Sequence, residues 1–261
     1  MNAPRQLQRI AVLVSVGRHP VSGTARYSRN DAAALEVGRQ LAERHRAQLD
    51  VLHAGDPANE ALAEYLALGA RQVEVLACHD GDDAAHALAA RVEGYDLVLT
   101  GTRAEGAYDT GMLPYRVAAT LGYPLVGAAA DVTVDGGRAA VRQFLPKGLR
   151  RRVDAALPAV VAVHPLANVA PRYAYARLRA GAIRPALTST GADADASAWK
   201  VGPIERKPVK LVAAEKRSGH ARMLSATTTE SRGGNVVNEG SSVEKAQVIL
   251  AYLREHQLID Y

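Results

Sequence analysis

DLVLTGTRAEGAYDTGMLPYRVAATLGYP, residues 96–124, is the stretch that decides the fold of this chain. It opens on a short apolar run at residues 97–99, which predicts a buried strand. A glycine-bearing loop follows at residues 101–109. Apolar residues at helical spacing then predict a helix over residues 110–121. Strand, loop and helix therefore follow one another as in an α/β sheet.

The loop itself has features that suit a phosphate. Gly101 and Gly106 can adopt positive φ without a Cβ penalty. Asp109 or Thr110 is a candidate N-cap, because a short side-chain oxygen can accept a hydrogen bond from a first-turn N–H. Free N–H groups and the positive end of a helix dipole then point at one spot, which favours an anion. The alternative is an ordinary joint between strand and helix that binds nothing.

The chain before this stretch repeats the same alternation. Asn30 or Asp31 is expected to cap the first helix. Parallel strands need crossover connections, so the alternation predicts α/β architecture: a doubly wound, mostly parallel sheet of the Rossmann-like or adenine-nucleotide α-hydrolase-like kind. In such sheets ligands bind outside the carboxyl ends of the strands. The expected strands are residues 10–16, 49–54 and 72–76, and the expected helices are residues 30–46, 58–68 and 83–93.

After Pro124 the rhythm changes to strands without helices. Asp-Gly-Gly at residues 135–137 is a hairpin signal, so we expect an antiparallel piece appended to the sheet. Strand character is found at residues 128–134, 139–144 and 149–153, and a further buried strand is expected at residues 157–163.

The C-terminal part of the sequence predicts a separate organisation. We expect an α/β domain over residues 1–187, followed at residues 188–261 by a linker, an extended arm and a helix. The linker is small and polar at residues 188–197, and helical spacing returns at residues 242–256. A long polar arm is costly to order alone, so the arm and helix are expected to wrap a partner subunit.

Composition excludes several classes of protein. The chain has 261 residues, of which 48% are hydrophobic. It has no apolar run of membrane-spanning length. The start shows no signal-peptide cleavage site, and the single cysteine, Cys78, suits a reducing compartment, so we expect a cytoplasmic protein that is not embedded in a membrane. The net charge is only +5 and aromatic residues are 5%, which argues against nucleic-acid binding.

Motifs of catalysis are missing from the sequence. There is no Walker A loop, no Gly-x-Gly-x-x-Gly fingerprint and no Gly-x-Ser-x-Gly elbow. The eight histidines show no metal-ligand spacing, and Cys78 reads as a spectator rather than a nucleophile. The basic cluster at residues 147–152 either meets an acidic partner or nucleic acid, or is a solvated hairpin edge that discourages sheet aggregation; the second is the simpler reading. The chain is therefore not expected to be an enzyme in its own right.

The order of short motifs nevertheless resembles the β subunit of electron transfer flavoproteins over nearly the whole chain. The motifs are VLVSVGR at 12–18, RNDAAALEVGRQL at 29–41, ALGARQVEVL at 67–76, DLVLTGTRAEGAYDTG at 96–111, LPAVVAV at 157–163 and PRY at 171–173.

The resemblance implies an αβ heterodimer that carries electrons from a flavin dehydrogenase to a quinone reductase or another acceptor. The redox-active FAD is expected mainly in the α subunit, and a structural AMP in this chain; a second FAD takes that place in electron-bifurcating members. Carried over by position, the nucleotide contacts would be Ser15, Asn30, Asp31, Ala32, Ala33, Ala54, Gly101, Thr102, Arg103, Ala104, Asp109 and Thr110.

The sequence also departs from the family pattern. Residues 29–32 read Arg-Asn-Asp-Ala where the family usually has Met-Asn-Pro-Phe, and residues 105–110 replace an Asp-Gly-Asp-Thr loop. In the stretch that docks dehydrogenases, residues 174–184, Ala176 stands where the family has a leucine and positive charges are few. This difference implies a specialised donor, such as an amine or methylamine-type dehydrogenase.

Two other classes share the predicted sheet. A free-standing nucleotide-binding protein of the universal-stress type has the same strand–helix rhythm, but the region after Pro124 and the expected arm argue against it. An adenylating enzyme or a hydrolase could also be built on this sheet, although the sequence offers no residues for that chemistry.

Overall fold

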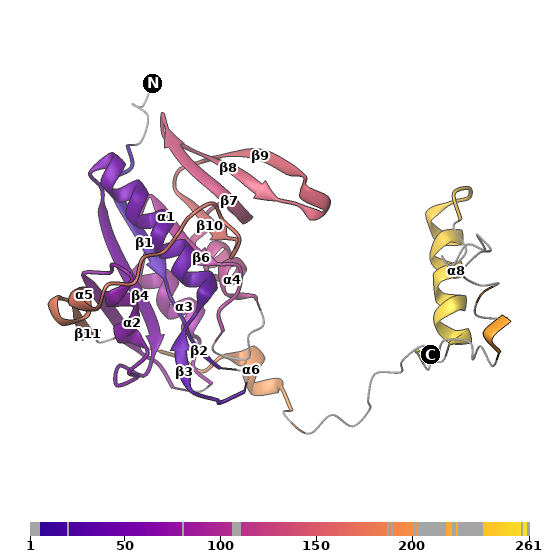
Figure 1. Cartoon of the computed structure of the whole chain (residues 1–261), viewed down its shortest axis with the longest axis horizontal. Helices are drawn as coiled ribbons and strands as arrows, with labels where there is room; N and C mark the ends of the chain where they lie inside the picture. The colour runs from indigo at the N-terminus through magenta and orange to yellow at the C-terminus, as the bar shows by residue number, and fades with distance from the viewer. Residues whose placement is uncertain are drawn as a thin grey trace. The chain divides into compact units, whose positions relative to one another are not determined.

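The structure is a computed structural model, and the chain divides into two compact units, Met1–Trp199 and Lys200–Tyr261 (Figure 1). Each unit is described by itself. The described residues are 6–19, 21–79, 81–105, 111–186, 188, 190–200, 202, 218–220, 223, 237–256 and 258–259.

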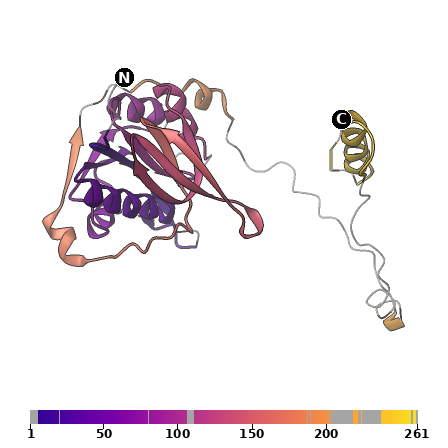
Figure 2. The same ribbon diagram turned by 90° about the horizontal axis from the view of Figure 1, so that it is seen from above.

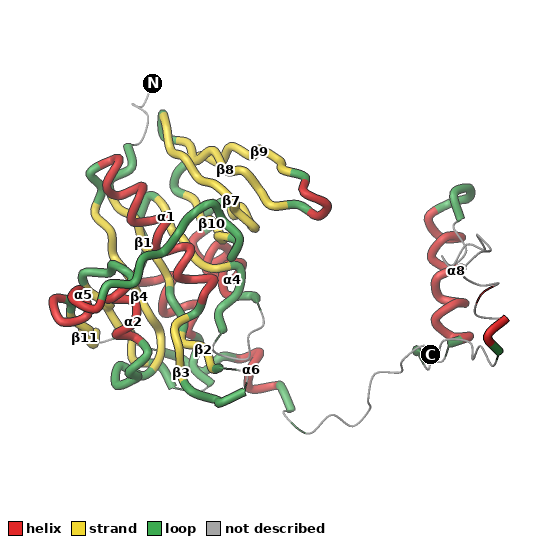
Figure 3. The backbone as a smooth tube through the Cα atoms, in the orientation of Figure 1, coloured by secondary structure: helices red, strands yellow, loops and turns green. Residues whose placement is uncertain are grey.

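A nine-stranded sheet forms the centre of the first unit (Figure 3). Its order is β11-β5-β4-β1-β6-β10-β7-β8-β9, parallel from β11 to β7 and antiparallel from β7 to β9. The chain adds β4 and β5 on one side of β1 and then returns to place β6 on the other, so the strand order reverses beside β1. The mostly parallel α/β fold predicted from the sequence is confirmed. The strands are β1 (Arg9–Leu13), β4 (Gln48–Gly55), β5 (Gln72–Ala77), β6 (Leu97–Gly101), β7 (Leu125–Asp135), β8 (Arg138–Phe144), β9 (Arg150–Ala156), β10 (Ala159–Val163) and β11 (Ala182–Ala186).

Helices cover both faces of this sheet because side chains along each strand alternate between the faces. In β1, Ile10 and Val12 are buried in a cluster with residues of α1 and α2, whereas Ala11 and Leu13 are buried with residues of α3 and α4. The sheet is therefore doubly wound. The helices of this unit are α1 (Arg29–His45), α2 (Leu62–Ala67), α3 (Ala84–Arg91), α4 (Leu113–Leu121), α5 (Tyr175–Ala180) and α6 (Ala194–Ala198).

Gly38 lets α1 lie close against the sheet. A Cβ at this position would stand 2.8 Å from Val12 Cγ2 and 3.2 Å from methyl carbons of Leu49 and Leu99. Three strands, β1, β4 and β6, thus meet the helix at a residue that has no side chain.

The antiparallel extension follows the predicted hairpin. Gly136 and Gly137 have φ of 52° and 76°. Positive φ at both central residues is the requirement of the two-residue hairpin turn that matches strand twist. β9 lies at one edge of the sheet, next to β8 in the extension seen from above in Figure 2. The side chains of Arg150, Arg151 and Arg152 on this strand are exposed. The basic cluster thus belongs to a solvated sheet edge.

Four short elements differ from the expectation. A hairpin of β2 (Val16–Arg18) and β3 (Ala25–Tyr27) occupies what reads as a plain loop, because three-residue strands are too short to show a period. β11 pairs with β5 at the other sheet edge, where Pro185 is tolerated because it need not donate a hydrogen bond inward. Part of the expected linker forms α6, whose N-cap Asp193 accepts from the N–H groups of Asp195 and Ala196.

The second unit contains α8 (Ser242–Glu255), in agreement with the predicted C-terminal helix. Ser241 caps it and exchanges hydrogen bonds with Glu244 in a capping box. The apolar side chains of Val243, Ile249 and Tyr252 are exposed.

Candidate functional site

One buried carboxylate joins the strand ends at the point where strand order reverses. Ser15 follows β1, Gly101 ends β6, and Asp31 lies in the first turn of α1. Asp31 Oδ2 accepts hydrogen bonds from the Ser15 N–H at 2.8 Å and from the Ser15 hydroxyl at 2.6 Å, and Oδ1 accepts from the Gly101 N–H at 3.0 Å. The carboxyl edge of the sheet is therefore fixed by a side chain from the helix that follows it.

The environment of Asp31 opposes its ionisation. The side chain is almost fully buried, and this desolvation raises the pKa of Asp31 to about 7, although the hydrogen bonds from Ser15 and Gly101 act in the opposite direction. The N-terminus of α1 near this residue also favours the ionised carboxylate, as the hydrogen bonds do. Asp31 is therefore poised to titrate near neutral pH.

The expectation that Asn30 or Asp31 caps α1 is wrong. Ser28 is the N-cap, and its hydroxyl accepts from the Asp31 N–H at 3.3 Å. Because Ser28 satisfies the helix end, the Asp31 carboxylate is available to the sheet.

Gly101 is needed for a reason other than the expected one. Its backbone lies outside the left-handed region, so the prediction of positive φ does not hold for this glycine. A Cβ there would instead overlap the Asp31 carboxylate and the Asn30 side chain. Gly106 lies outside the described residues.

Two further residues extend this network beyond what the sequence revealed. The Tyr65 hydroxyl donates to the Ser15 carbonyl at 2.6 Å and accepts from the Ser28 N–H at 2.9 Å. The Glu105 N–H donates to the Ser15 hydroxyl oxygen at 3.0 Å, and the Glu105 carboxylate is 2.7 Å from Arg26 of β3. In the sequence, Tyr65 looks like another residue on the apolar face of a helix. Its spacing does not indicate that its hydroxyl joins this network.

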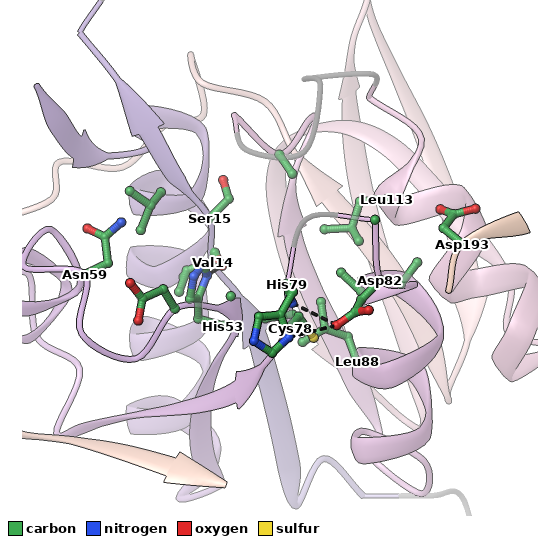
Figure 4. A pocket seen from close by; sticks show the side chains of 18 of the residues that line it. Val14, Ser15, His53, Asn59, Cys78, His79, Asp82, Leu88, Leu113 and Asp193 are labelled. Carbon is green, nitrogen blue, oxygen red and sulfur yellow. Dashed lines mark hydrogen bonds and ion pairs between the residues drawn. The ribbon is translucent and has the colours of Figure 1, made fainter. Parts of the chain in front are cut away.

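A cavity of about 650 Å³ opens beside this network (Figure 4). Its wall comes from the carboxyl ends of β1, β4 and β5, from the hairpin of β2 and β3, from the starts of α3 and α4, and from Asp193, Ala196 and Trp199. A ligand site was predicted outside the carboxyl ends of the strands, where the strand order reverses. The cavity lies at this place and is large enough for a small-molecule ligand.

His53 supplies a hydrogen-bond acceptor on this wall. Its Nδ1 lies 2.8 Å from the Val14 carbonyl oxygen. A carbonyl can only accept, so Nδ1 carries the hydrogen. Burial lowers the pKa of His53, which keeps the ring neutral at pH 7. The neutral ring leaves Nε2 as an acceptor; Figure 4 shows the ring beside Val14.

The predicted site residues fall into separate places. Ser15, Ala54 and Ala104 line the cavity. Asp31 and Gly101 form the network behind it, with Asn30 buried against Gly101. Ala32 and Ala33 are buried in the core, Thr102 is half-buried, and Arg103 is exposed. Asp109 and Thr110 lie outside the described residues. The expectation that one of them caps the following helix is wrong, because α4 begins at Leu113 and its N-cap is Met112.

The cavity offers little to nucleophilic or metal chemistry. Cys78 lines it, but burial and the neighbouring Asp82 and Asp83 raise the pKa of the Cys78 thiol, which disfavours the reactive thiolate. Within the described ranges, histidines, cysteines and carboxylates form no group of three or more that could hold a metal ion. No helix in those ranges has the length and apolarity needed to cross a membrane.

Comparison with known proteins shows the family to which this chain belongs. The family described as electron transfer flavoprotein domain matches residues 22–201. The chain is also 35% identical to the electron transfer flavoprotein subunit beta of Chromohalobacter salexigens over 257 residues, covering 96% of this chain and 95% of that protein. The chain therefore belongs to the electron transfer flavoprotein family and is similar to its β subunits along nearly its full length.

Proposed function

We propose that this chain is the β subunit of a heterodimeric electron transfer flavoprotein. It would serve the transfer of electrons from a flavin dehydrogenase to a quinone reductase or another acceptor, with the FAD held mainly by the α subunit. The family match over residues 22–201 supports this role and leaves the free-standing universal-stress alternative without support.

We propose that an adenine nucleotide, AMP, occupies the cavity. AMP has no redox chemistry of its own, so its part is structural. The cavity volume is about 650 Å³, a size typical of small-molecule sites. The observation that carries the proposal is the hydrogen-bonded network of Ser15, Asp31 and Gly101, which fixes the strand ends beside that cavity.

The described residues suit the parts of an adenine nucleotide. His53 Nε2 is a neutral acceptor beside Ala54, suited to the exocyclic amino group of adenine. α4 starts at the cavity, with Met112 and Leu113 in the cavity wall, which suits a phosphate near that helix end. The Ser15 hydroxyl is already engaged with Asp31 and Glu105, so we assign it to positioning rather than to direct binding. Asp109 and Thr110 remain candidates from the resemblance alone.

The second unit is proposed to hold the α subunit. The exposed apolar side chains of α8 are those expected of a helix that docks on another protein. Val243, Ile249 and Tyr252 would supply that contact.

We assign donor docking to α5 and the residues around it. α5 is largely exposed and carries Ala176 at the position of the family's leucine, together with Arg177 and Arg179. A small side chain cannot fill a pocket shaped for leucine, which is why we propose a specialised donor such as an amine-type dehydrogenase.

Co-expression with the neighbouring α-subunit reading frame tests the assignment. The two chains should purify together as a yellow heterodimer with one FAD. A colourless chain that purifies alone, while the α subunit is soluble in the same cells, would contradict the proposed role.

A further inference from the structure

A polar segment closes one side of the cavity. Residues 190–199, which we name the strap, cross the joint between β5 and α3 and contribute Asp193, Ala196 and Trp199 to the cavity wall. In the strap only Ala192 forms a β-bridge, with Asp82, and α6 is its only helix. Its attachment must therefore come from individual contacts.

Backbone contacts attach the strap at its first residues. The Asp83 N–H donates to the Gly191 carbonyl at 2.8 Å, and the Asp193 N–H donates to the Gly81 carbonyl at 2.7 Å. The Thr190 hydroxyl donates to Asp82 at 3.0 Å. These bonds hold residues 190–193.

Arg116 adds a charged contact to this attachment. From α4 its guanidinium donates through Nη1 to Asp193 and through Nη2 to Asp83 at 2.9 Å. Asp193 is the N-cap of α6, and Asp83 is the N-cap of α3. One arginine thus joins the starts of two helices from a third, and Arg116 itself lines the cavity.

This junction is charged and mostly shielded. The Asp193 side chain is 10% exposed and the Arg116 side chain 32% exposed. The Arg116 hydrogen bond lowers the pKa of Asp193, and Asp193 with Asp83 raises the pKa of Arg116, so both stay charged at neutral pH. Asp193 is the only fully buried residue of the strap, and Trp199 at its end is half-buried, with 47% of its surface exposed.

We propose that Arg116 and Asp193 form a latch that keeps the strap in place as a wall of the nucleotide cavity, so that nucleotide leaves only when the latch opens. The inference rests on the proposed function, because it takes the occupant to be an adenine nucleotide. Arg116 and Asp193 are positioning residues here. Segments that bury few side chains open locally before the fold as a whole does, and the strap, in which Asp193 alone is fully buried, is such a segment.

The test uses the full chain in its heterodimer and two latch variants. Asp193→Asn removes the charge but keeps a side-chain oxygen that can cap α6. Arg116→Met removes the guanidinium and keeps the aliphatic stem. Arg91→Met is the matched control, because Arg91 makes a similar two-pronged pair with Glu74, at 2.7 and 2.8 Å, away from the cavity.

Two readouts are compared across these proteins. Amide hydrogen exchange should become faster in residues 190–198 of both latch variants, with or without nucleotide. Release of radiolabelled AMP, chased by unlabelled AMP, should accelerate about tenfold, as expected for the loss of a charge-assisted hydrogen bond. Arg91→Met should change neither.

The outcomes separate the two proposals. If the wild type retains AMP and the latch variants release it at the wild-type rate, the latch is refuted and the nucleotide site stands. Unchanged exchange in residues 190–198 would also refute the latch. If the wild type binds no AMP at all, the proposed nucleotide function fails and the latch falls with it.

Discussion

Asp31 shows how one residue can serve both the fold and the site. Its carboxylate accepts three hydrogen bonds from Ser15 and Gly101, and no other described side chain connects the ends of β1 and β6 in this way. Burial raises its pKa to about 7. The geometry at the strand ends therefore depends on a group whose charge changes in the physiological range.

This raised pKa gives a pH dependence with a definite sign. A carboxyl whose folded-state pKa lies above its unfolded value contributes stability at low pH, and that contribution is lost as pH rises from about 4 to about 7. Asp31→Asn removes the titration and leaves a backbone donor unpaired, at a cost of about 1–3 kcal/mol. The free energy of unfolding of the wild type minus that of Asp31→Asn, from urea titrations, should decline between pH 4 and 7 and level off above. A difference that stays level over this range would show that Asp31 is already ionised at pH 4 in the folded chain.

The proposed contact of His53 with adenine predicts which nucleotide base the cavity prefers. If Nε2 accepts from the exocyclic amino group, the wild type should bind AMP more tightly than IMP, which has an oxygen there. His53→Leu should lose most of this preference, a change of about tenfold in the affinity ratio, because one hydrogen bond is removed. Calorimetric titration of nucleotide-free protein measures both affinities.

The matched control for His53 is His86→Leu, the same substitution at an exposed histidine on α3 that does not line the cavity. Its affinity ratio should equal that of the wild type. An unchanged ratio in His53→Leu would show that His53 does not read the base.

The sequence identified several of these residues as candidates, but it did not reveal their contacts. Ser15, Asp31 and Gly101 stood out from the resemblance, and the structure brings them into one network. Tyr65 and His53 did not stand out, because an aromatic residue on a helix and a histidine in a strand look like ordinary core residues. Hydrogen bonds such as Tyr65 to Ser15 join residues far apart in the chain, and local spacing cannot reveal them.

Among the elements, α1 depends on its close approach to the sheet at Gly38. Gly38→Ala gains helix propensity of about 0.5–1 kcal/mol, but the new methyl overlaps Val12, and overpacking costs about 1–3 kcal/mol. We expect a net loss of unfolding free energy of about 1 kcal/mol. Chemical denaturation measures it, with Gln40→Ala, at an exposed position of the same helix, as the control. A more stable Gly38→Ala would show that the sheet can move aside.

The outer strand β9 gives a second prediction at this scale. Exposed arginines on an edge strand discourage pairing with a second sheet edge. Replacing Arg150, Arg151 and Arg152 with threonine should therefore increase self-association, measured by light scattering at rising concentration, whereas lysine at the same positions should not. Equal scattering from both triple variants would show that the arginines do not prevent self-association.

Elements with a strong hydrophobic period were predictable, and short or polar ones were not. The apolar runs of β1, β6 and β10 and the stripe of α1 were all identified from sequence. α6 and β11 were missed because little of either is buried. α6 is attached through Asp193, and β11, which pairs with β5, packs only the partly buried Ile183 and Ala186 against the core. Both elements depend on contacts with the folded sheet, which a local sequence pattern does not show.

At the scale of the whole molecule, the account assigns different tasks to the two units. The unit Met1–Trp199 would hold the nucleotide, and the unit Lys200–Tyr261 would hold the α subunit. The sequence indicated both tasks, one through the strand–loop–helix joints and the other through a polar arm ending in a helix.

The nucleotide content of the purified heterodimer tests the central claim, that the carboxyl edge of this sheet binds AMP, most directly. Extraction with acid followed by chromatography should yield one AMP and one FAD for each heterodimer. Two FAD and no AMP, or FAD without any second nucleotide, would contradict it.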